Sequence, residues 1–191
     1  MDMKYPIGIQ NFEKMRTDGY AYVDKTALMY KLTSEGTYYF LSRPRRFGKS
    51  LFLSTLEAYF EGQKELFEGL AVSQLETEWV KYPIMHLDLN TAKYDTPEAL
   101  YDMLDDFLAK EEEKYGSAPT ERSFGLRFQG VIRRTFEKTG RRVVILIDEY
   151  DKPMLQAIGN EPLQTEYRNT LKAFYGALKS CDRYIRFAFL T

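Results

Sequence analysis

Residues 38–50 read YYFLSRPRRFGKS and combine an aromatic run with a basic loop that contains Gly-Lys-Ser. The stretch begins with an aromatic run at residues 38–42 that is typical of a β-strand, and a basic loop follows at residues 43–50. Apolar residues at helical spacing then occupy residues 51–60, with Gly62 as a stop signal. A strand, a loop that contains Gly-Lys-Ser and a helix, in that order, form the context of a phosphate-binding loop.

The chemistry of this loop depends on three residues. Gly48 lets backbone N–H groups approach a phosphate closely, and the helix that follows adds the positive end of its dipole. Lys49 supplies a point charge for the β- and γ-phosphates, and the Ser50 hydroxyl is a ligand for Mg²⁺. The first glycine of the usual motif is replaced by Arg43. The predicted nucleotide-binding residues are Arg43, Pro44, Arg45, Arg46, Phe47, Gly48, Lys49, Ser50 and Leu51.

A second motif follows an aliphatic run. Residues 143–147 (VVILI) are apolar at every position, which predicts a strand buried on both faces of a parallel sheet. Asp148 and Glu149 come next, in the Walker B pattern: Asp148 would hold Mg²⁺ through its water shell, and Glu149 would be the base for the attacking water. Two acids alone suit a turn before Pro153, but the combination with the Lys49 loop favours catalysis.

Short apolar runs alternate with longer helical periods, which predicts an α/β fold with a mainly parallel sheet. Further strands are expected at residues 84–89 and 184–190. Helices are expected near residues 12–15, 27–32, 96–116 with a cap at Thr96, 122–138 and from 162 onward. Both motifs follow strands, and ligands bind at the carboxyl ends of strands in such sheets.

Composition excludes several classes of site. The 191 residues include 27 Lys and Arg and 28 Asp and Glu, so the net charge of −1 gives no case for nucleic acid or anionic membrane as a partner. One cysteine, Cys181, and one histidine, His86, exclude an internal disulfide and a Cys/His zinc site. His86 lies in an apolar run and is expected in the core. Without a membrane span or a signal-peptide core, a cytoplasmic location is expected.

Polar residues at other strand ends are weaker candidates. Thr191 ends the last predicted strand, where ATPases often place a polar sensor of the γ-phosphate, although a structural threonine fits equally well. Asp88 and Asn90 end the strand at residues 84–89, and a structural turn is the better interpretation for both.

The chain resembles the AAA-ATPase-like domain of a bacterial family along nearly its whole length. The matching pieces are residues 5–12 (YPIGIQNF), 22–26 (YVDKT), 39–50, 58–62 (AYFEG) and 146–153 (LIDEYDKP). Arginine in place of the first loop glycine is usual in that family. The resemblance implies a P-loop NTPase fold, a three-layer α/β/α sandwich with a mainly parallel sheet, and ATP with Mg²⁺ as cofactors.

The resemblance also implies which part of the chain forms which part of the domain. Residues 1–37 would contribute to the nucleotide base site, with residues 9–12 and 22–26 near the adenine, and residues 38–191 would form the ATPase core. Sheets of this type usually have a fifth strand beyond the first, so we expect a domain truncated after its fourth core strand, with residues 38–42 near an exposed edge. Members often carry a C-terminal PD-(D/E)XK nuclease-like domain, which is therefore an expected partner.

The leading hypothesis is a Mg²⁺-dependent ATPase that switches an attached domain or partner, with Glu149 and Lys49 catalytic and Ser50 and Asp148 at the metal. One alternative is a regulatory module that binds nucleotide with negligible hydrolysis. Another is the ATPase part of a nucleic-acid-processing protein. Contact with DNA would rest on Arg133, Arg134, Arg141 and Arg142, a cluster that better fits a helix end. The sequence assigns neither an oligomeric state nor the source of an arginine finger.

Overall fold

The structure, a computed structural model, describes residues 4–42, 44 and 46–191. In this part of the chain a parallel sheet has the strand order β1-β4-β3-β2. The strands are β1 (Tyr38–Phe40), β2 (Ile84–Asp88), β3 (Val143–Asp148) and β4 (Ile185–Leu190). The expected α/β class and parallel sheet are confirmed, and β1 lies at an edge, as expected.

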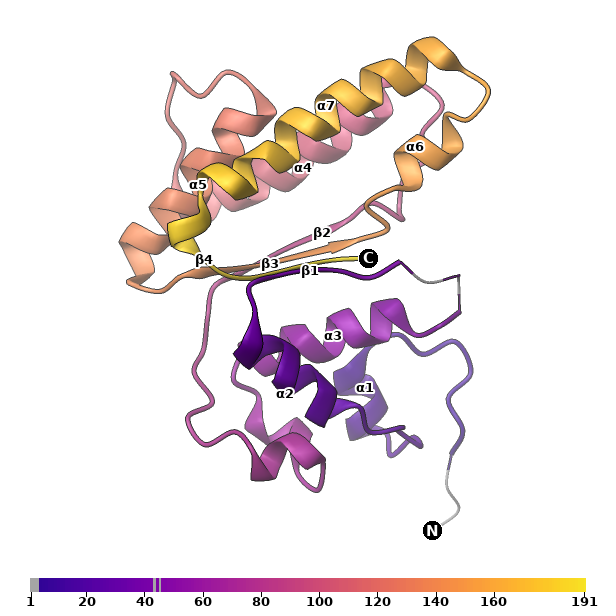
Figure 1. Ribbon diagram of the computed structural model, residues 1–191, viewed down its shortest axis with the longest axis vertical. Coiled ribbons are helices and arrows are strands. Elements are labelled where there is room, and N and C mark those ends of the chain that lie inside the picture. The colour runs from indigo at the N-terminus through magenta and orange to yellow at the C-terminus, as the bar shows by residue number, and fades with distance from the viewer. Residues whose placement is uncertain (1–3, 43, 45) are drawn as a thin grey trace.

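Helices cover both faces of the sheet, which makes a three-layer sandwich (Figure 1). The chain crosses from β1 to β2 beneath the sheet and returns through β3 to β4 above it, as right-handed crossovers require. The lower layer holds α1 (Phe12–Thr17), α2 (Thr26–Glu35), α3 (Lys49–Phe60), η1 (Lys64–Phe67) and η2 (Ala71–Gln74). The upper layer holds α4 (Pro97–Tyr115), α5 (Phe124–Thr139), α6 (Lys152–Gln156), α7 (Glu161–Ser180) and η3 (Asp182–Tyr184).

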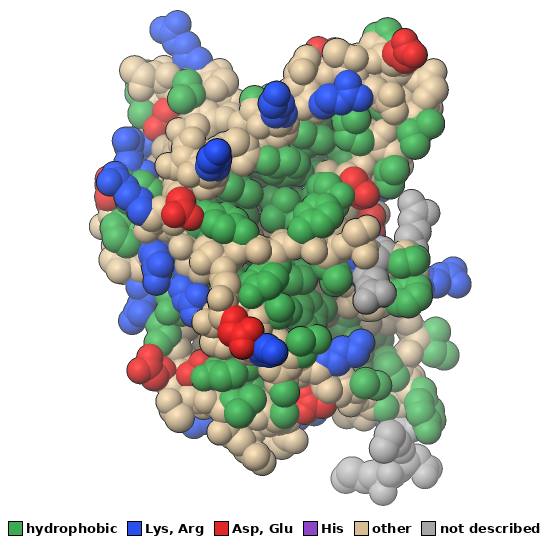
Figure 2. Space-filling view, viewed as in Figure 1, with side chains coloured by type: hydrophobic (Ala, Val, Ile, Leu, Met, Phe, Trp, Pro, Cys, Tyr) green, Lys and Arg blue, Asp and Glu red, His purple; other side chains and the backbone are tan. Residues whose placement is uncertain are grey.

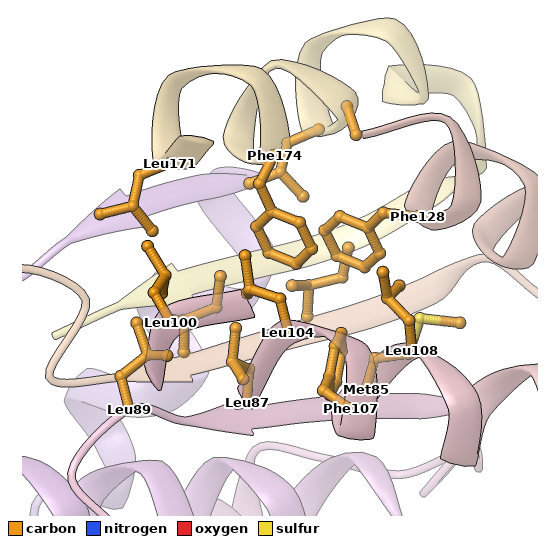
Figure 3. Close-up of a cluster of buried hydrophobic side chains, with 14 of the residues drawn as sticks. Met85, Leu87, Leu89, Leu100, Leu104, Phe107, Leu108, Phe128, Leu171 and Phe174 are labelled. Atoms are coloured by element: carbon orange, nitrogen blue, oxygen red, sulfur yellow. The ribbon is translucent and has the colours of Figure 1, made fainter. Parts of the chain in front are cut away.

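The two helical layers enclose separate cores because side chains of β3 alternate between the faces of the sheet. Val143, Ile145 and Ile147 join the upper core, whereas Val144 and Leu146 join the lower one. All six residues of β3 are buried, as its aliphatic sequence predicted. Figure 3 shows part of the upper core, where the rings of Phe128 and Phe174 stack with centroids 4.5 Å apart. The packed cores hold the strand ends, and therefore the motifs, in place.

Local signals set most helix boundaries. The helix expected at residues 96–116 is α4, with Thr96 as its N-cap residue, but the Thr96 side chain makes no capping hydrogen bond. Its carbonyl instead accepts hydrogen bonds from the Ala99 amide and the Tyr167 hydroxyl. The sequence carries no periodic signal for α6, η1 and η2, because four or five residues are too few to show helical periodicity.

Candidate functional site

The described part of the loop between β1 and α3 contains two residues in the left-handed backbone conformation. Gly48 has φ +76° and Arg46 has φ +68°, and α3 begins immediately afterwards at Lys49. A Cβ atom on Gly48 would meet nothing within 4 Å, so the glycine is required by its left-handed conformation and not by space. Pro44, Arg46 and Phe47 are exposed, and the predicted binding residues Arg43 and Arg45 lie outside the described residues.

The acidic motif ends β3 as predicted. Asp148 is 6% exposed and lies on the same face of β3 as Val144 and Leu146, the face that packs against α3. One of its oxygens, Oδ1, accepts hydrogen bonds from the Thr191 hydroxyl at 2.5 Å and from the Glu149 amide at 3.0 Å. A buried carboxylate at the carboxyl end of a central strand is well placed for a ligand.

Glu149 adopts an unusual backbone conformation, with φ +53°. Such a conformation costs a residue other than glycine roughly 1–3 kcal/mol and is concentrated at functional sites. The chain turns sharply here, and the Glu149 carbonyl accepts a hydrogen bond from the Lys152 amide at 3.0 Å. The turn directs the chain away from the sheet just after the two acids.

The two motifs meet although they are far apart in sequence. The Nζ atom of Lys49 lies 3.6 Å from Oε1 of Glu149, and the two side chains are only 12% and 18% exposed. Ser50 is the second residue of α3 and therefore belongs to the same helical turn as Lys49. The fold thus gathers a lysine, a hydroxyl and two carboxylates at the carboxyl end of the sheet.

These residues suit a nucleotide with Mg²⁺. The Ser50 hydroxyl and the Asp148 carboxylate are hard oxygen donors of the kind that Mg²⁺ prefers. Among residues 4–42, 44 and 46–191, no group of three or more His, Cys, Asp or Glu side chains could hold a metal ion. A magnesium ion at this site would therefore depend on phosphate oxygens and water for most of its ligands.

A largely apolar cavity of about 650 Å³ adjoins the loop. It lies between the segment before α2, strand β1 and the first turns of α3, and Lys49 belongs to its wall. Figure 2 shows hydrophobic side chains gathered on this face of the molecule, around the edge of the sheet. Its lining residues include Pro6, Tyr22, Val23, Leu28, Tyr39, Gly48, Lys49 and Phe52. Its volume is in the range of small-molecule sites.

The segment at residues 22–26 reaches this cavity, whereas residues 9–12 do not line it. Phe12 lies behind Tyr22, with ring centroids 5.1 Å apart. Asp24 holds the segment through hydrogen bonds from the Thr26 amide and hydroxyl and from the Ala71 amide. Burial acts to raise the pKa of Asp24, but these hydrogen bonds outweigh it and leave the pKa below its usual value. Burial also raises the pKa of Tyr22.

The structure redefines several weaker candidates. His86 is not a core residue: it lies on edge strand β2, partly exposed, with Nδ1 3.2 Å from Oε2 of Glu57. Asp88 is in register with Asp148 on the neighbouring strand. Lys152 donates hydrogen bonds to the main-chain carbonyl and the side-chain amide oxygen of Asn90, which ties the two loops together. Sequence spacing carried no signal for these cross-strand contacts.

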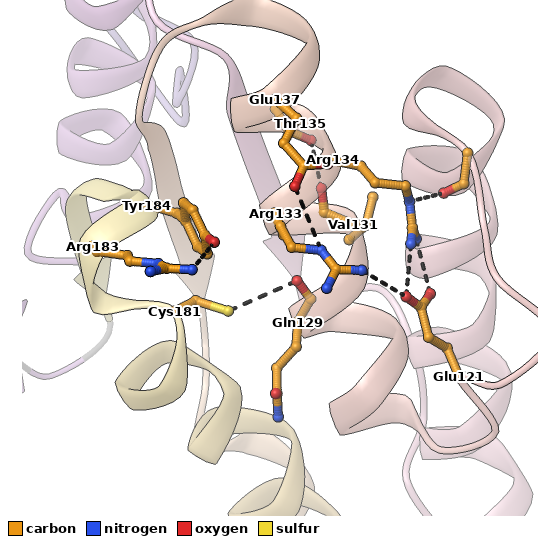
Figure 4. A network of polar contacts seen from close by, with 11 residues as sticks. Glu121, Gln129, Val131, Arg133, Arg134, Thr135, Glu137, Cys181, Arg183 and Tyr184 are labelled. Carbon is orange, nitrogen blue, oxygen red and sulfur yellow. Dashed lines mark hydrogen bonds and ion pairs between the residues drawn. The ribbon is translucent and has the colours of Figure 1, made fainter.

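The arginine cluster lies elsewhere. Arg134 donates hydrogen bonds to both carboxylate oxygens of Glu121, at 2.7 and 2.9 Å, and to the Gly116 carbonyl at 2.8 Å (Figure 4). The Nη2 atom of Arg133 lies 3.9 Å from Oε1 of Glu121, and its Nε atom lies 3.8 Å from Oε1 of Glu137. These residues are on α5, which ends just before the amino end of β3, whereas the motifs lie at the carboxyl end. The Arg134 contacts fix the loop between α4 and α5.

Across the described ranges, no helix is both long and apolar enough to span a bilayer.

The fold and the site define a three-layer α/β/α protein of the P-loop type. The family model for predicted AAA-ATPases, AAA-ATPase-like, matches residues 6–191, and the chain belongs to this family. A protein of Azotobacter chroococcum mcd 1, described as an uncharacterized protein in the vnfD 5′ region, is 41% identical over 190 residues. The alignment covers 98% of this chain but 37% of that relative, so the chain spans little more than a third of its length. No solved structure matches the chain.

Proposed function

We propose that the chain binds ATP with Mg²⁺ and hydrolyses the bond between its β- and γ-phosphates. The observation that carries the proposal is the 3.6 Å contact between Lys49 and Glu149, because it brings the phosphate-binding loop and the acidic strand end into one site. Membership of a family of predicted AAA-ATPases supports the same chemistry.

Each residue has a distinct role in this proposal. The loop from Arg43 to Leu51 would surround the phosphates with its backbone N–H groups, which every residue except Pro44 carries, and Lys49 would neutralise the charge of the β- and γ-phosphates. Ser50 and Asp148 would hold Mg²⁺, and the bound ion would neutralise part of the negative charge of the phosphates. Glu149 would take the proton of the attacking water, since a carboxylate is a suitable base near neutral pH.

The base and ribose would occupy the apolar cavity beside the loop. Its wall includes Tyr22 and Val23 from the first 37 residues, together with Gly48 and Lys49 of the loop. One continuous cavity can therefore receive the base at one end while the phosphates reach Lys49. In this proposal, residues 1–37 contribute to the nucleotide base site and residues 38–191 form the ATPase core.

We further propose that hydrolysis switches an attached domain or partner. The Azotobacter relative, of which this chain matches 37%, has room for such a domain. A cytoplasmic location suits an enzyme that consumes ATP.

Equilibrium binding of a fluorescent ATP analogue, followed by measurement of phosphate release, tests the proposal. Lys49→Ala is expected to weaken binding by about 10–100-fold, because a charge-assisted hydrogen bond contributes roughly 1.5–3 kcal/mol. Lys110→Ala is the matched control, since Lys110 is exposed on α4 and pairs with Asp106. Equal affinity in the wild type and Lys49→Ala would refute the site.

Phosphate release separates the enzyme from a regulatory module. An arginine finger is worth about 10³–10⁵ in rate, so release should be followed over a range of protein concentrations in which subunits can meet. Binding without release at every concentration would favour a module that binds nucleotide and does not hydrolyse it.

A further inference from the structure

Thr191 occupies a distinctive place at the end of the central strands. It is 2% exposed, and its hydroxyl donates a hydrogen bond of 2.5 Å to Oδ1 of Asp148. Its amide donates to the Ile147 carbonyl at 2.9 Å, and its carbonyl accepts from the Tyr150 amide at 2.9 Å. Side chain and backbone of Thr191 therefore contact the residues on both sides of Glu149.

The first consequence concerns the orientation of Asp148. Two donors converge on Oδ1, the Thr191 hydroxyl and the Glu149 amide. Hydrogen bonds to an ionised carboxylate are short and strong, and this carboxylate is buried. Two convergent donors on one oxygen restrict rotation of the carboxylate, so the other oxygen, Oδ2, is presented in one fixed direction.

The second consequence concerns Glu149. Its left-handed backbone is held between two neighbours that are both anchored, Asp148 by the Thr191 hydroxyl and Tyr150 by the Thr191 carbonyl. A strained conformation persists only where the surrounding structure determines it. The end of β4 thus supplies the contacts that keep the turn at Glu149 in place.

We infer that Thr191 is a positioning residue: it holds the Asp148 carboxylate in the orientation that receives Mg²⁺ and anchors the turn that carries Glu149. The inference rests on the proposed ATP and Mg²⁺ site. It differs from a role as γ-phosphate sensor, because the Thr191 hydroxyl donates to the acid at the metal position. The effect of the hydroxyl is therefore on the metal and reaches the nucleotide only through it, whereas the turn at Glu149 is anchored by the backbone of Thr191.

The test compares Thr191→Val, which keeps the shape and loses the hydroxyl, with Thr191→Ser, which keeps the donor. Binding of a fluorescent ATP analogue is titrated with Mg²⁺, and the Mg²⁺ concentration at half-maximal enhancement is the readout. Thr191→Val should raise this concentration by roughly 10–100-fold, the usual effect of removing a partner of a metal ligand. Thr191→Ser should stay within about threefold of the wild type.

The metal-free measurement separates positioning from other roles. With EDTA present, Thr191→Val should bind the ATP and ADP analogues as tightly as the wild type does. A selective loss of metal-free ATP binding would overturn the inference in favour of a γ-phosphate contact. Equal loss for both nucleotides would overturn it in favour of a purely structural role, and an unchanged Mg²⁺ dependence would also overturn it.

Failure of the proposed function would look different. The wild type itself would then bind no nucleotide, or would bind it without any response to Mg²⁺. If only the role of Thr191 is wrong, the wild type still responds to Mg²⁺. The Thr191→Val and Thr191→Ser variants then do not differ from it in the expected way.

Discussion

Lys49 and Glu149 form an ion pair, with Nζ and Oε1 3.6 Å apart, in a site where both side chains are mostly buried. The proposed reaction requires each of them for a different partner: Lys49 for phosphate and Glu149 for water. In the proposed reaction, ATP would therefore compete with Glu149 for the positive charge of Lys49. The contact between the two opposite charges also limits the free-energy cost of burying either charge alone.

Glu149→Gln tests this relationship. We expect phosphate release to fall by about 10²–10⁴-fold, the usual contribution of a general base. Affinity for the ATP analogue should be unchanged or higher, since Lys49 is no longer neutralised by its neighbour. Glu98→Gln, on the first turn of α4, is the control and should change neither quantity. A fall in affinity that parallels the fall in turnover would contradict the assigned role.

Gly48→Ala tests the loop backbone. The glycine has φ +76° and free space around a Cβ atom, so the only penalty is the left-handed conformation, about 1–2 kcal/mol. We expect a lower free energy of unfolding and weaker binding of the ATP analogue. Gly176→Ala in α7, where a Cβ atom also meets nothing within 4 Å, should instead stabilise by roughly 1 kcal/mol. Urea unfolding measures the change in the free energy of unfolding of both variants. A change of the same sign in the two variants would refute the prediction.

Arg134→Lys tests the clamp on the loop between α4 and α5. Arg134 is 15% exposed and reaches Glu121 with two hydrogen bonds and the Gly116 carbonyl with a third, a geometry that lysine cannot reproduce. We expect the free energy of unfolding to fall by about 1–3 kcal/mol. Arg133→Lys, at a residue whose side chain is 50% exposed, should cost less than about 0.5 kcal/mol. Thermal or urea unfolding measures the free energy of unfolding of both variants. An equal fall in the two variants would show that Arg134 is an ordinary surface residue.

The His86–Glu57 pair predicts a pH dependence. Burial acts to lower the pKa of His86, but the hydrogen bond and charge of Glu57 outweigh it, and the pKa is raised above 6.5. The pair therefore stabilises the fold fully below about pH 6.5, and this contribution is lost as the pH rises through the higher folded-state pKa. Glu57→Gln should reduce stability at pH 6 more than at pH 8.5. Urea unfolding at both values tests this, and a cost that is independent of pH would exclude it.

Much of the fold followed from local pattern. The run at residues 143–147 is aliphatic throughout, and β3 is indeed buried on both faces, because only a central strand of a covered sheet can use such a sequence. The helical periods of α4, α5 and α7 were also recognisable, since each helix buries one apolar face over many turns. The short α6 was missed because five residues show no period.

The environment of single polar residues is harder to predict from the sequence. His86 sits in an apolar run, which suggested a core position, but the strand order puts β2 at an edge, where alternate side chains are partly open to solvent. Sequence periodicity reports that a residue is in a strand; the neighbours of that strand decide whether its second face is covered.

The residues proposed to carry the chemistry are recognisable from local sequence: Lys49 and Ser50 after a strand and glycine loop, and Asp148 and Glu149 after an aliphatic strand. These are local signals, since a loop that binds phosphate and a strand that ends in acids are each encoded within about ten residues. Three relationships are visible only in the folded chain: Lys49 contacts Glu149, the Thr191 hydroxyl donates a hydrogen bond to Asp148, and an apolar cavity opens beside the loop. Those relationships arise from the strand order β1-β4-β3-β2, which brings segments that are far apart in the sequence to the carboxyl end of the sheet. No local pattern encodes this packing.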